Sequence, residues 1–125
     1  MKKAVDGKEL RTTHVVESVE GKPDTPYNFF HEQVAFRPCV ILRLEVGKFG
    51  WIAVEPDYDA GFLHRVHTSP IINVQVDGDT ISVETRNTFY RFRKVDDGEL
   101  CRVRFDPDRW EENIDYWEAM GNDLP

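Results

Sequence analysis

The chain has 125 residues, a length typical of one domain, and 40% hydrophobic and 12% aromatic residues to form a core. Its net charge of −7 and isoelectric point near 5.0 disfavour duplex DNA or RNA as a partner. The apolar runs are too short for a membrane-spanning helix or a signal peptide. We therefore expect no membrane partner and a single domain over residues 1–125, with residues 1–8 flexible.

The first half of the chain has a loose strand pattern interrupted by glycine and proline. Pro38 interrupts the longest apolar alternation, so that strand is expected to be bulged or to begin at a sheet edge. Strands are expected over 12–19, 34–46 and 51–54, a loop over 21–26, a short helical turn or irregular chain over 27–32, a hairpin turn over 47–50 and a polar loop over 56–61.

The second half predicts an antiparallel meander of four strands. Asp77-Gly78 is a strong two-residue hairpin signal, and Arg86-Asn87 indicates the next turn. A third turn is expected over 96–99. The four strands are expected over 72–76, 81–85, 89–93 and 101–105.

A helix is predicted at the C-terminal end. Asp106 is a good N-cap and Pro107 suits the first helical position. Apolar side chains then recur at helical spacing, and Gly121-Asn122 is a stop signal. The apolar stripe, which is expected to pack on the sheet, consists of Trp110, Ile114, Trp117 and Met120. The predicted fold class is thus α+β, a mainly antiparallel β meander with a C-terminal amphipathic helix.

The two cysteines, Cys39 and Cys101, lie in strand-like segments with apolar neighbours. Thiols in this setting are usually buried and reduced, and a disulfide is the alternative. Reduced thiols indicate a cytoplasmic location.

Positive charge is concentrated between Arg86 and Arg104. Six cationic and three acidic side chains give this stretch a charge of +3, although the whole chain is acidic. A cationic island of this size suits a small anion, whereas a nucleic acid would need a wider positive field.

Strand alternation places four of these arginines on one side of the predicted sheet. If their two strands are hairpin neighbours, the guanidinium groups lie roughly 5 Å apart and repel one another unless an anion lies among them. Phosphate oxygens suit the guanidinium fork. The alternative is a solvated face paired with the chain's own carboxylates. The four side chains are those of Arg91, Arg93, Arg102 and Arg104.

Polar and aromatic residues accompany the arginines. Phe89 has the same strand parity as Arg91 and could stack on a base or pack in a subunit contact. Thr85 and Asn87 precede the strand and could orient a polar ligand. For Asn87, an ordinary turn position is the alternative.

Other chemistry has weaker support in the sequence. His64 and His67 fall on opposite faces of a strand, so we expect neither a metal nor another cofactor. A hydrolase using Asp57, Asp59 and His67 lacks carboxylate spacing that would assign an acid and a base. We expect no enzymatic activity.

The acidic segment from Asp106 onward carries a net charge of −6. This charge leaves open an inhibitor or adaptor that binds a protein partner through the C-terminal helix.

Residues 85–92, Thr-Arg-Asn-Thr-Phe-Tyr-Arg-Phe, resemble a Thr-x-Asn-Ser/Thr-x-Tyr strand of the phage-encoded anti-Thoeris sponge proteins. These are small, mainly antiparallel β proteins that assemble and sequester cyclic ADP-ribose signals without cleaving them. The resemblance implies a homo-oligomeric counter-defence protein acting in the host cytoplasm, with its ligand held between subunits. It matches Thr85 and Asn87 to the strand motif, and Arg104 and Arg109 to downstream phosphate-binding arginines.

The charge pattern and the resemblance together predict a non-catalytic protein that binds a small phosphate-bearing nucleotide. The acidic inhibitor or adaptor is the second hypothesis. The predicted ligand-binding residues are Thr85, Asn87, Phe89, Arg91, Arg93, Arg102, Arg104 and Arg109.

Overall fold

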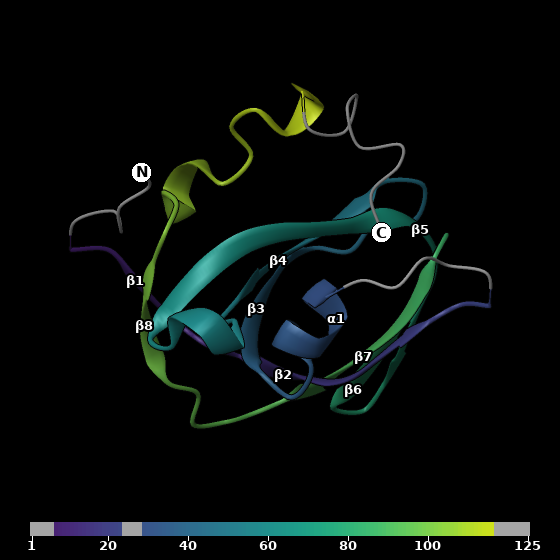
Figure 1. Ribbon diagram of the computed structural model, residues 1–125, viewed down its shortest axis with the longest axis horizontal. Coiled ribbons are helices and arrows are strands. Elements are labelled where there is room, and N and C mark those ends of the chain that lie inside the picture. The colour runs from purple at the N-terminus through teal and green to yellow at the C-terminus, as the bar shows by residue number, and fades with distance from the viewer. Residues whose placement is uncertain (1–6, 24–28, 117–125) are drawn as a thin grey trace.

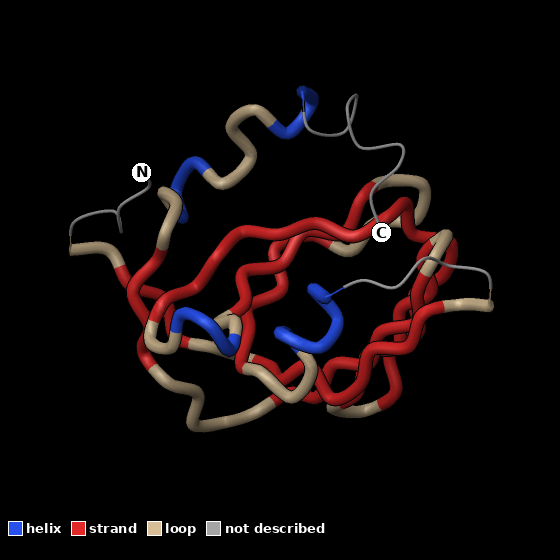
Figure 2. The backbone as a smooth tube through the Cα atoms, in the orientation of Figure 1, coloured by secondary structure: helices blue, strands red, loops and turns tan. Residues whose placement is uncertain are grey.

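Six antiparallel strands close into a barrel in the computed structural model, which describes residues 7–23 and 29–116 (Figures 1 and 2). Two further strands form an extension beside the barrel. The strands are β1 (Glu9–Arg11), β2 (His14–Gly21), β3 (Pro38–Arg43), β4 (Phe49–Val54), β5 (Phe62–Asp77), β6 (Thr80–Thr85), β7 (Thr88–Lys94) and β8 (Leu100–Val103). The helical elements are α1 (Phe29–Val34) and the 3-10 turns η1 (Asp57–Asp59) and η2 (Pro107–Arg109).

The barrel closes because β5 is long enough to pair with two strands in succession. Its first part pairs with β4 as far as Pro70, and from Ile71 onward it pairs with β6. The ring then runs from β6 through β7, β2 and β3 back to β4. The ring is closed between β2 and β3 by two residue pairs, His14 with Cys39 and Val15 with Pro38, and the irregular register near Ile71 supplies the bend.

The predicted meander is confirmed from β5 to β7. Gly78 turns the chain between β5 and β6 with φ 61°, the left-handed conformation that the Asp-Gly signal indicates. β6 then pairs with β7 in antiparallel register. The mainly antiparallel β character of the fold is therefore as the sequence predicts.

The barrel interior is filled by alternate residues of the strands. On β7, Tyr90 and Phe92 are buried whereas Phe89 and Arg91 are exposed, as the alternation predicts. Val34 of α1 belongs to the same core, so the helix contributes an apolar side chain to the interior. The buried members are Val16, Val34, Cys39, Ile52, Val54, Ile71, Val83, Tyr90 and Phe92.

The position of β8 corrects the predicted order of the strands. β8 does not follow β7 as a hairpin neighbour. It pairs antiparallel with β1 and parallel with the start of β5. The turn signals of residues 96–99 are present, but apolar contacts distant in the sequence decide where the strand goes. Cys101 and Val103 of β8 pack on Ala53 and Leu63 in a second core outside the barrel.

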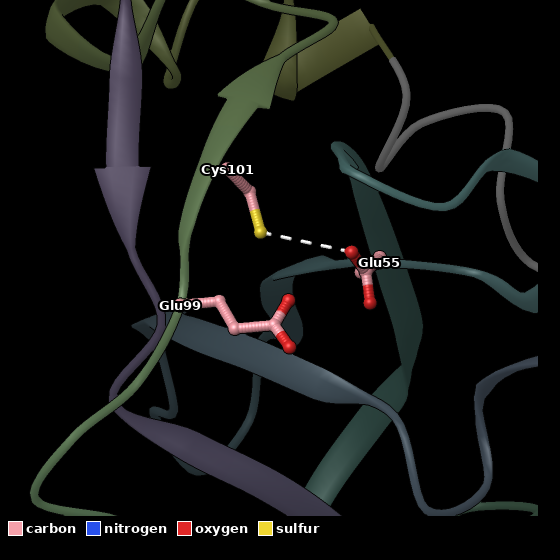
Figure 3. Close-up of side chains that lie close together, drawn as sticks. All are labelled: Glu55, Glu99 and Cys101. Carbon is pink, nitrogen blue, oxygen red and sulfur yellow. Dashed lines mark hydrogen bonds between the residues drawn. The ribbon is translucent and has the colours of Figure 1, made fainter.

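Cys101 of this second core faces Glu55, which directly follows β4 (Figure 3). Both cysteines are free and buried, which confirms the prediction of reduced thiols. Burial raises the pKa of Cys39 to about 12, and burial together with the Glu55 and Glu99 carboxylates raises the pKa of Cys101 to about 11.

The C-terminal helix does not form as predicted within the described residues. Asp106 accepts a hydrogen bond from the backbone of Asp108, which confirms the cap, but it begins only the 3-10 turn η2. Residues 110–113 then form turns, and α-helical residues are present only at 114–116 of the described chain. Asn113 has φ 68°, and the Arg65 guanidinium donates to the carbonyl oxygens of Trp110 and Glu112. The predicted helix is therefore interrupted between η2 and residue 114. The remaining stripe residues, Trp117 and Met120, lie outside the described residues.

None of the helices in residues 7–23 and 29–116 is long and apolar enough to cross a membrane.

Candidate functional site

A pocket of about 360 Å³ lies on the outer face of four consecutive barrel strands, β2, β7, β6 and β5. This volume is at the small end of the range for sites that bind small molecules. Its lining is mostly polar. The lining residues are Ser18, Glu20, Asn73, Gln75, Ser82, Val83, Glu84, Phe89, Tyr90 and Arg91.

Cross-strand pairing arranges the pocket in two rows. Phe89 of β7 lies between Glu20 of β2 and Glu84 of β6. Ser18 and Ser82 flank Arg91 in the same way. Because directly opposite side chains lie about 5 Å apart, each row presents its groups side by side. Asn73 and Gln75 of β5 extend the rows on the far side of β6.

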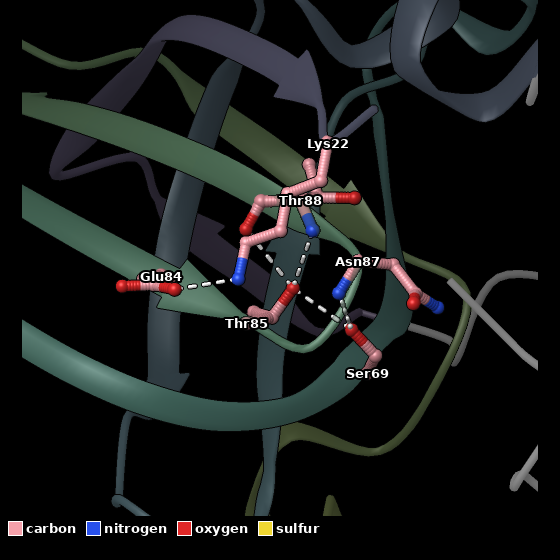
Figure 4. A network of polar contacts seen from close by, with 6 residues as sticks. All are labelled: Lys22, Ser69, Glu84, Thr85, Asn87 and Thr88. Carbon is pink, nitrogen blue, oxygen red and sulfur yellow. Dashed lines mark hydrogen bonds and ion pairs between the residues drawn. The ribbon is translucent and has the colours of Figure 1, made fainter. Parts of the chain in front are cut away.

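The first row forms an aromatic end with carboxylates on both sides. Phe89 is 44% exposed, enough to contact a ligand. Lys22 lies over part of this aromatic end. Its Nζ is 5.0 Å from the centroid of the Phe89 ring and 2.5 Å from Glu84 Oε2 (Figure 4 shows the Lys22–Glu84 pair). The Lys22 ammonium neutralises Glu84, whereas Glu20 forms no ion pair within the described residues.

The second row leads into a cationic end. Arg91 and Arg93 point to the same side of β7, about 7 Å apart along the strand. Glu17 is shared between them, with its Oε2 3.2 Å from Arg93 Nε and its Oε1 3.9 Å from Arg91 Nη1. Both arginine side chains are more than half exposed, so this pairing is weak and solvent-screened. Two guanidinium groups around one carboxylate leave one positive charge.

A buried hydroxyl network holds the turn that precedes Phe89 (Figure 4). Ser69 Oγ donates to Thr85 Oγ1 over 2.8 Å, and the Thr88 backbone N–H donates to the same oxygen over 3.0 Å. The Asn87 N–H donates to Ser69 Oγ over 3.2 Å, which places Asn87 in the turn. Thr85 is fully buried, which corrects the expectation that it orients a ligand by direct contact. Its hydroxyl instead fixes the β6–β7 connection from within.

We expect Thr85→Val to lower the free energy of unfolding by about 2 kcal/mol, because it leaves the Ser69 hydroxyl and the Thr88 N–H without their buried acceptor. Thr85→Ser keeps the hydroxyl and should cost no more than about 1 kcal/mol, the contribution of one methyl group. Urea denaturation of both variants measures the difference. Equal destabilisation by the two substitutions would show that the hydrogen bonds contribute nothing.

The predicted face of four arginines does not form. Arg91 and Arg93 lie on β7 between β2 and β6, whereas Arg102 is on β8 between β1 and β5, and Arg104 follows that strand. The error follows from the assumed β7–β8 hairpin. Arg109 lies in η2, where its Nη2 is 2.7 Å from Glu112 Oε1.

Arg104 is engaged by the protein's own groups. Its Nε lies 3.0 Å from Asp59 Oδ2, and its guanidinium carbon lies 3.7 Å from the centroid of the Phe62 ring. His64 Nε2 is 2.7 Å from the same Asp59 oxygen. Arg104 and His64 together hold the pKa of Asp59 below its usual value. The Arg104–Asp59 ion pair therefore connects η1 to the end of β8.

The histidines serve different parts of the structure. His64 contacts Tyr58 and Asp59 of η1, whereas the His67 ring stacks on Phe49 at a centroid distance of 4.9 Å. His67 thus contacts Phe49 and Trp51 of β4, two members of a third apolar cluster. The Asp57, Asp59 and His67 set considered for hydrolysis thus has Asp59 bonded to His64 and Arg104 rather than to His67.

Sequence reasoning found Phe89 and Arg91 but missed the other side of the pocket. Ser18 and Glu20 come from a strand about seventy positions earlier, and Asn73 and Gln75 come from the second part of β5. The alternation of polar residues in these strands was visible in the sequence, but the barrel register that brings them beside β7 was not.

Comparison with protein-family models, with curated proteins and with solved structures gave no significant match.

Proposed function

We propose that the protein is a non-catalytic binding protein that sequesters a small phosphate-bearing nucleotide in the pocket on β2, β7, β6 and β5. The observation that carries this proposal is the order of groups along β7. An exposed aromatic ring at Phe89 is followed on the same face by Arg91 and then Arg93.

The aromatic end suits a base. Stacking on an aromatic side chain contributes about 1–3 kcal/mol per base and tolerates any base, because each has a flat apolar face. Glu20 and Glu84 lie on either side of Phe89 and offer acceptors for exocyclic amino groups or ribose hydroxyls. Lys22, on a long flexible side chain, can remain on Glu84 while the ligand takes the open part of the ring.

The cationic end suits a phosphate. Arg91 lies about 7 Å from Phe89 along the strand and Arg93 about 7 Å further, a span comparable with that from a base to its phosphate groups. A phosphate between the two guanidinium groups would replace Glu17, whose contacts there are solvent-exposed. Bidentate guanidinium–phosphate pairing is stronger than such a surface ion pair.

The ligand type and the biological role in this proposal follow the resemblance of residues 85–92 to the anti-Thoeris sponge proteins. On that basis we propose a cyclic ADP-ribose-type signal, held intact, and a role against host immune signalling. A second copy of the chain would close the pocket. Light scattering with and without ligand measures whether the chain assembles.

Calorimetry with cyclic ADP-ribose isomers and with AMP tests the proposal. We expect Arg91→Ala to weaken binding about 10- to 100-fold and to reduce its salt dependence, because it removes a charge-assisted phosphate contact. Phe89→Ala should weaken it by about 10-fold through lost stacking. Mass spectrometry after denaturation should return the ligand intact.

Arg109→Ala is the matched control, because this arginine is 66% exposed, paired with Glu112 and absent from the pocket lining. It should leave the affinity unchanged. Weaker binding in Arg109→Ala with normal binding in Arg91→Ala would move the site to the C-terminal arginines. Absence of heat with every nucleotide would contradict the proposal as a whole.

A further inference from the structure

Two carboxylates and a thiol converge at the edge of the second core. Glu55, Glu99 and Cys101 place one oxygen or sulfur atom each within 4.8 Å of one another (Figure 3). Glu55 follows β4, whereas Glu99 directly precedes β8 and Cys101 lies in that strand. None of the three lines the pocket proposed for the nucleotide.

Glu55 is held in a fixed orientation. Its side chain is buried, its Oε2 accepts a hydrogen bond of 2.6 Å from the Gly61 N–H, and the Arg37 guanidinium donates to its Oε1. Cys101 Sγ lies 3.7 Å from Oε2. Arg37 also donates from Nε to the Glu55 backbone carbonyl over 3.0 Å. The carboxylate is thus positioned before any ligand arrives.

The local charges do not balance. Arg37 compensates the charge of Glu55, but Glu99 forms no ion pair within the described part of the chain, although its carboxylate faces Glu55 and Cys101 (Figure 3). Two carboxylates this close repel each other beside a low-dielectric core. Glu99 is exposed, so the cluster is open to solvent on that side, while Cys101 is buried on the other.

Thr12 gives an independent indication of a missing partner. Its side chain is 2% exposed, and Oγ1 has no hydrogen-bond partner in the described residues. The Thr12 N–H donates to the Glu99 carbonyl over 2.9 Å, continuing the β1–β8 pairing of Leu10 with Cys101. Alternate residues of a strand share a face, so Thr12 lies on the Cys101 side. Buried hydroxyls in folded proteins are nearly always satisfied by protein, water or an ion.

We propose that Glu55, Glu99 and Cys101 bind a divalent transition-metal ion of the zinc type. The Cys101 thiolate and one oxygen from each carboxylate supply three ligands, and the Thr12 hydroxyl or a water completes four-coordination. Thiolate coordination selects zinc-like ions over Ca²⁺ and Mg²⁺, which prefer oxygen ligands alone. The thiol proton leaves to solvent.

Charge neutrality supports this ligand set. A divalent ion with one thiolate and two carboxylates carries −1, which the Arg37 guanidinium balances. The bound ion would join the end of β4 to the β1–β8 extension, elements that the described structure links here through the Glu55–Cys101 contact and the apolar second core. Metal binding should therefore stabilise the fold as well as occupy the site.

Titration of the whole protein with Co²⁺ tests the proposal, since cobalt takes zinc sites and reports thiolate coordination by a near-ultraviolet charge-transfer band. We expect one equivalent per chain, displacement by Zn²⁺ and a rise in Tm with excess Zn²⁺. Cys101→Ser should abolish the band. Cys39→Ala removes the other free thiol, which lies in the barrel core, and should keep the band.

Glu99→Gln changes an exposed side chain and so keeps the fold while removing one ligand. It should weaken Co²⁺ binding by about 10-fold or more and reduce the Zn²⁺-dependent rise in Tm. The proposal is overturned if the wild-type protein gives no band, if the band survives Cys101→Ser, or if Glu99→Gln binds as tightly as the wild type.

Discussion

Gly98→Ala is expected to lower the free energy of unfolding by at least about 3 kcal/mol, a cost typical of severe overpacking. A Cβ atom on Gly98 would lie 1.7 Å from the carbonyl oxygen of Thr12 and 2.5 Å from its Oγ1. The carbonyl belongs to the backbone and cannot rotate away. Relieving this clash requires β1 to move. That movement would strain the hydrogen bond from the Thr12 N–H to the Glu99 carbonyl and the 2.8 Å bond from Arg11 Nη1 to the Gly98 carbonyl.

Gly21→Ala is the matched control. Gly21 also lacks a positive φ, but the nearest atom to its added Cβ is 3.8 Å away on the His31 ring, an ordinary contact distance. We expect a change within about 0.5 kcal/mol, as for most surface substitutions. Urea denaturation compares the two variants. A loss of less than about 1 kcal/mol for Gly98→Ala would show that β1 and β8 are not packed as closely as described.

Gly98 also shows where sequence reasoning reached its limit for the fold. The glycine was predicted to be part of a turn between two hairpin neighbours, but residues 95–99 form an irregular connection with a bend at 96–97. Its need for glycine, however, comes from Thr12, more than eighty positions earlier. Turn residues report local backbone geometry, whereas the choice of partner strand depends on apolar contacts between distant segments, here those of Cys101 with Ala53 and Leu63.

The candidate pocket shows the same difference between local geometry, which the sequence predicts, and the pairing of distant strands, which it does not. Strand alternation correctly placed Phe89 and Arg91 outside and Tyr90 and Phe92 inside, because the period of two is a local property. The grouping of Arg91 with Arg104 failed because it required a particular pairing of strands. Glu55 and Cys101 were not connected at all, since they lie in separate segments without any shared spacing that indicates a metal site.

Phe92→Ala is expected to lower the free energy of unfolding by about 3–5 kcal/mol, the range measured for fully buried phenylalanines. Phe92 is 0% exposed, and its ring stacks on Tyr90 at a centroid distance of 6.1 Å. It is the largest of the fully buried side chains among the described residues. The barrel wall is hydrogen-bonded on both sides of β7, so it cannot collapse to fill the cavity.

Phe89→Ala is the control for Phe92→Ala, because the two phenylalanines lie three residues apart on β7 and point to opposite faces. Phe89 is 44% exposed, so its removal should cost at most about 1 kcal/mol of stability. Nucleotide affinity should change in the opposite order: Phe89→Ala weakens it, whereas folded Phe92→Ala retains it because the pocket lining is intact. Urea denaturation and calorimetry on both variants measure the four quantities. If Phe92→Ala instead reduces affinity while Phe89→Ala does not, the ligand site lies inside the barrel and not on its outer face.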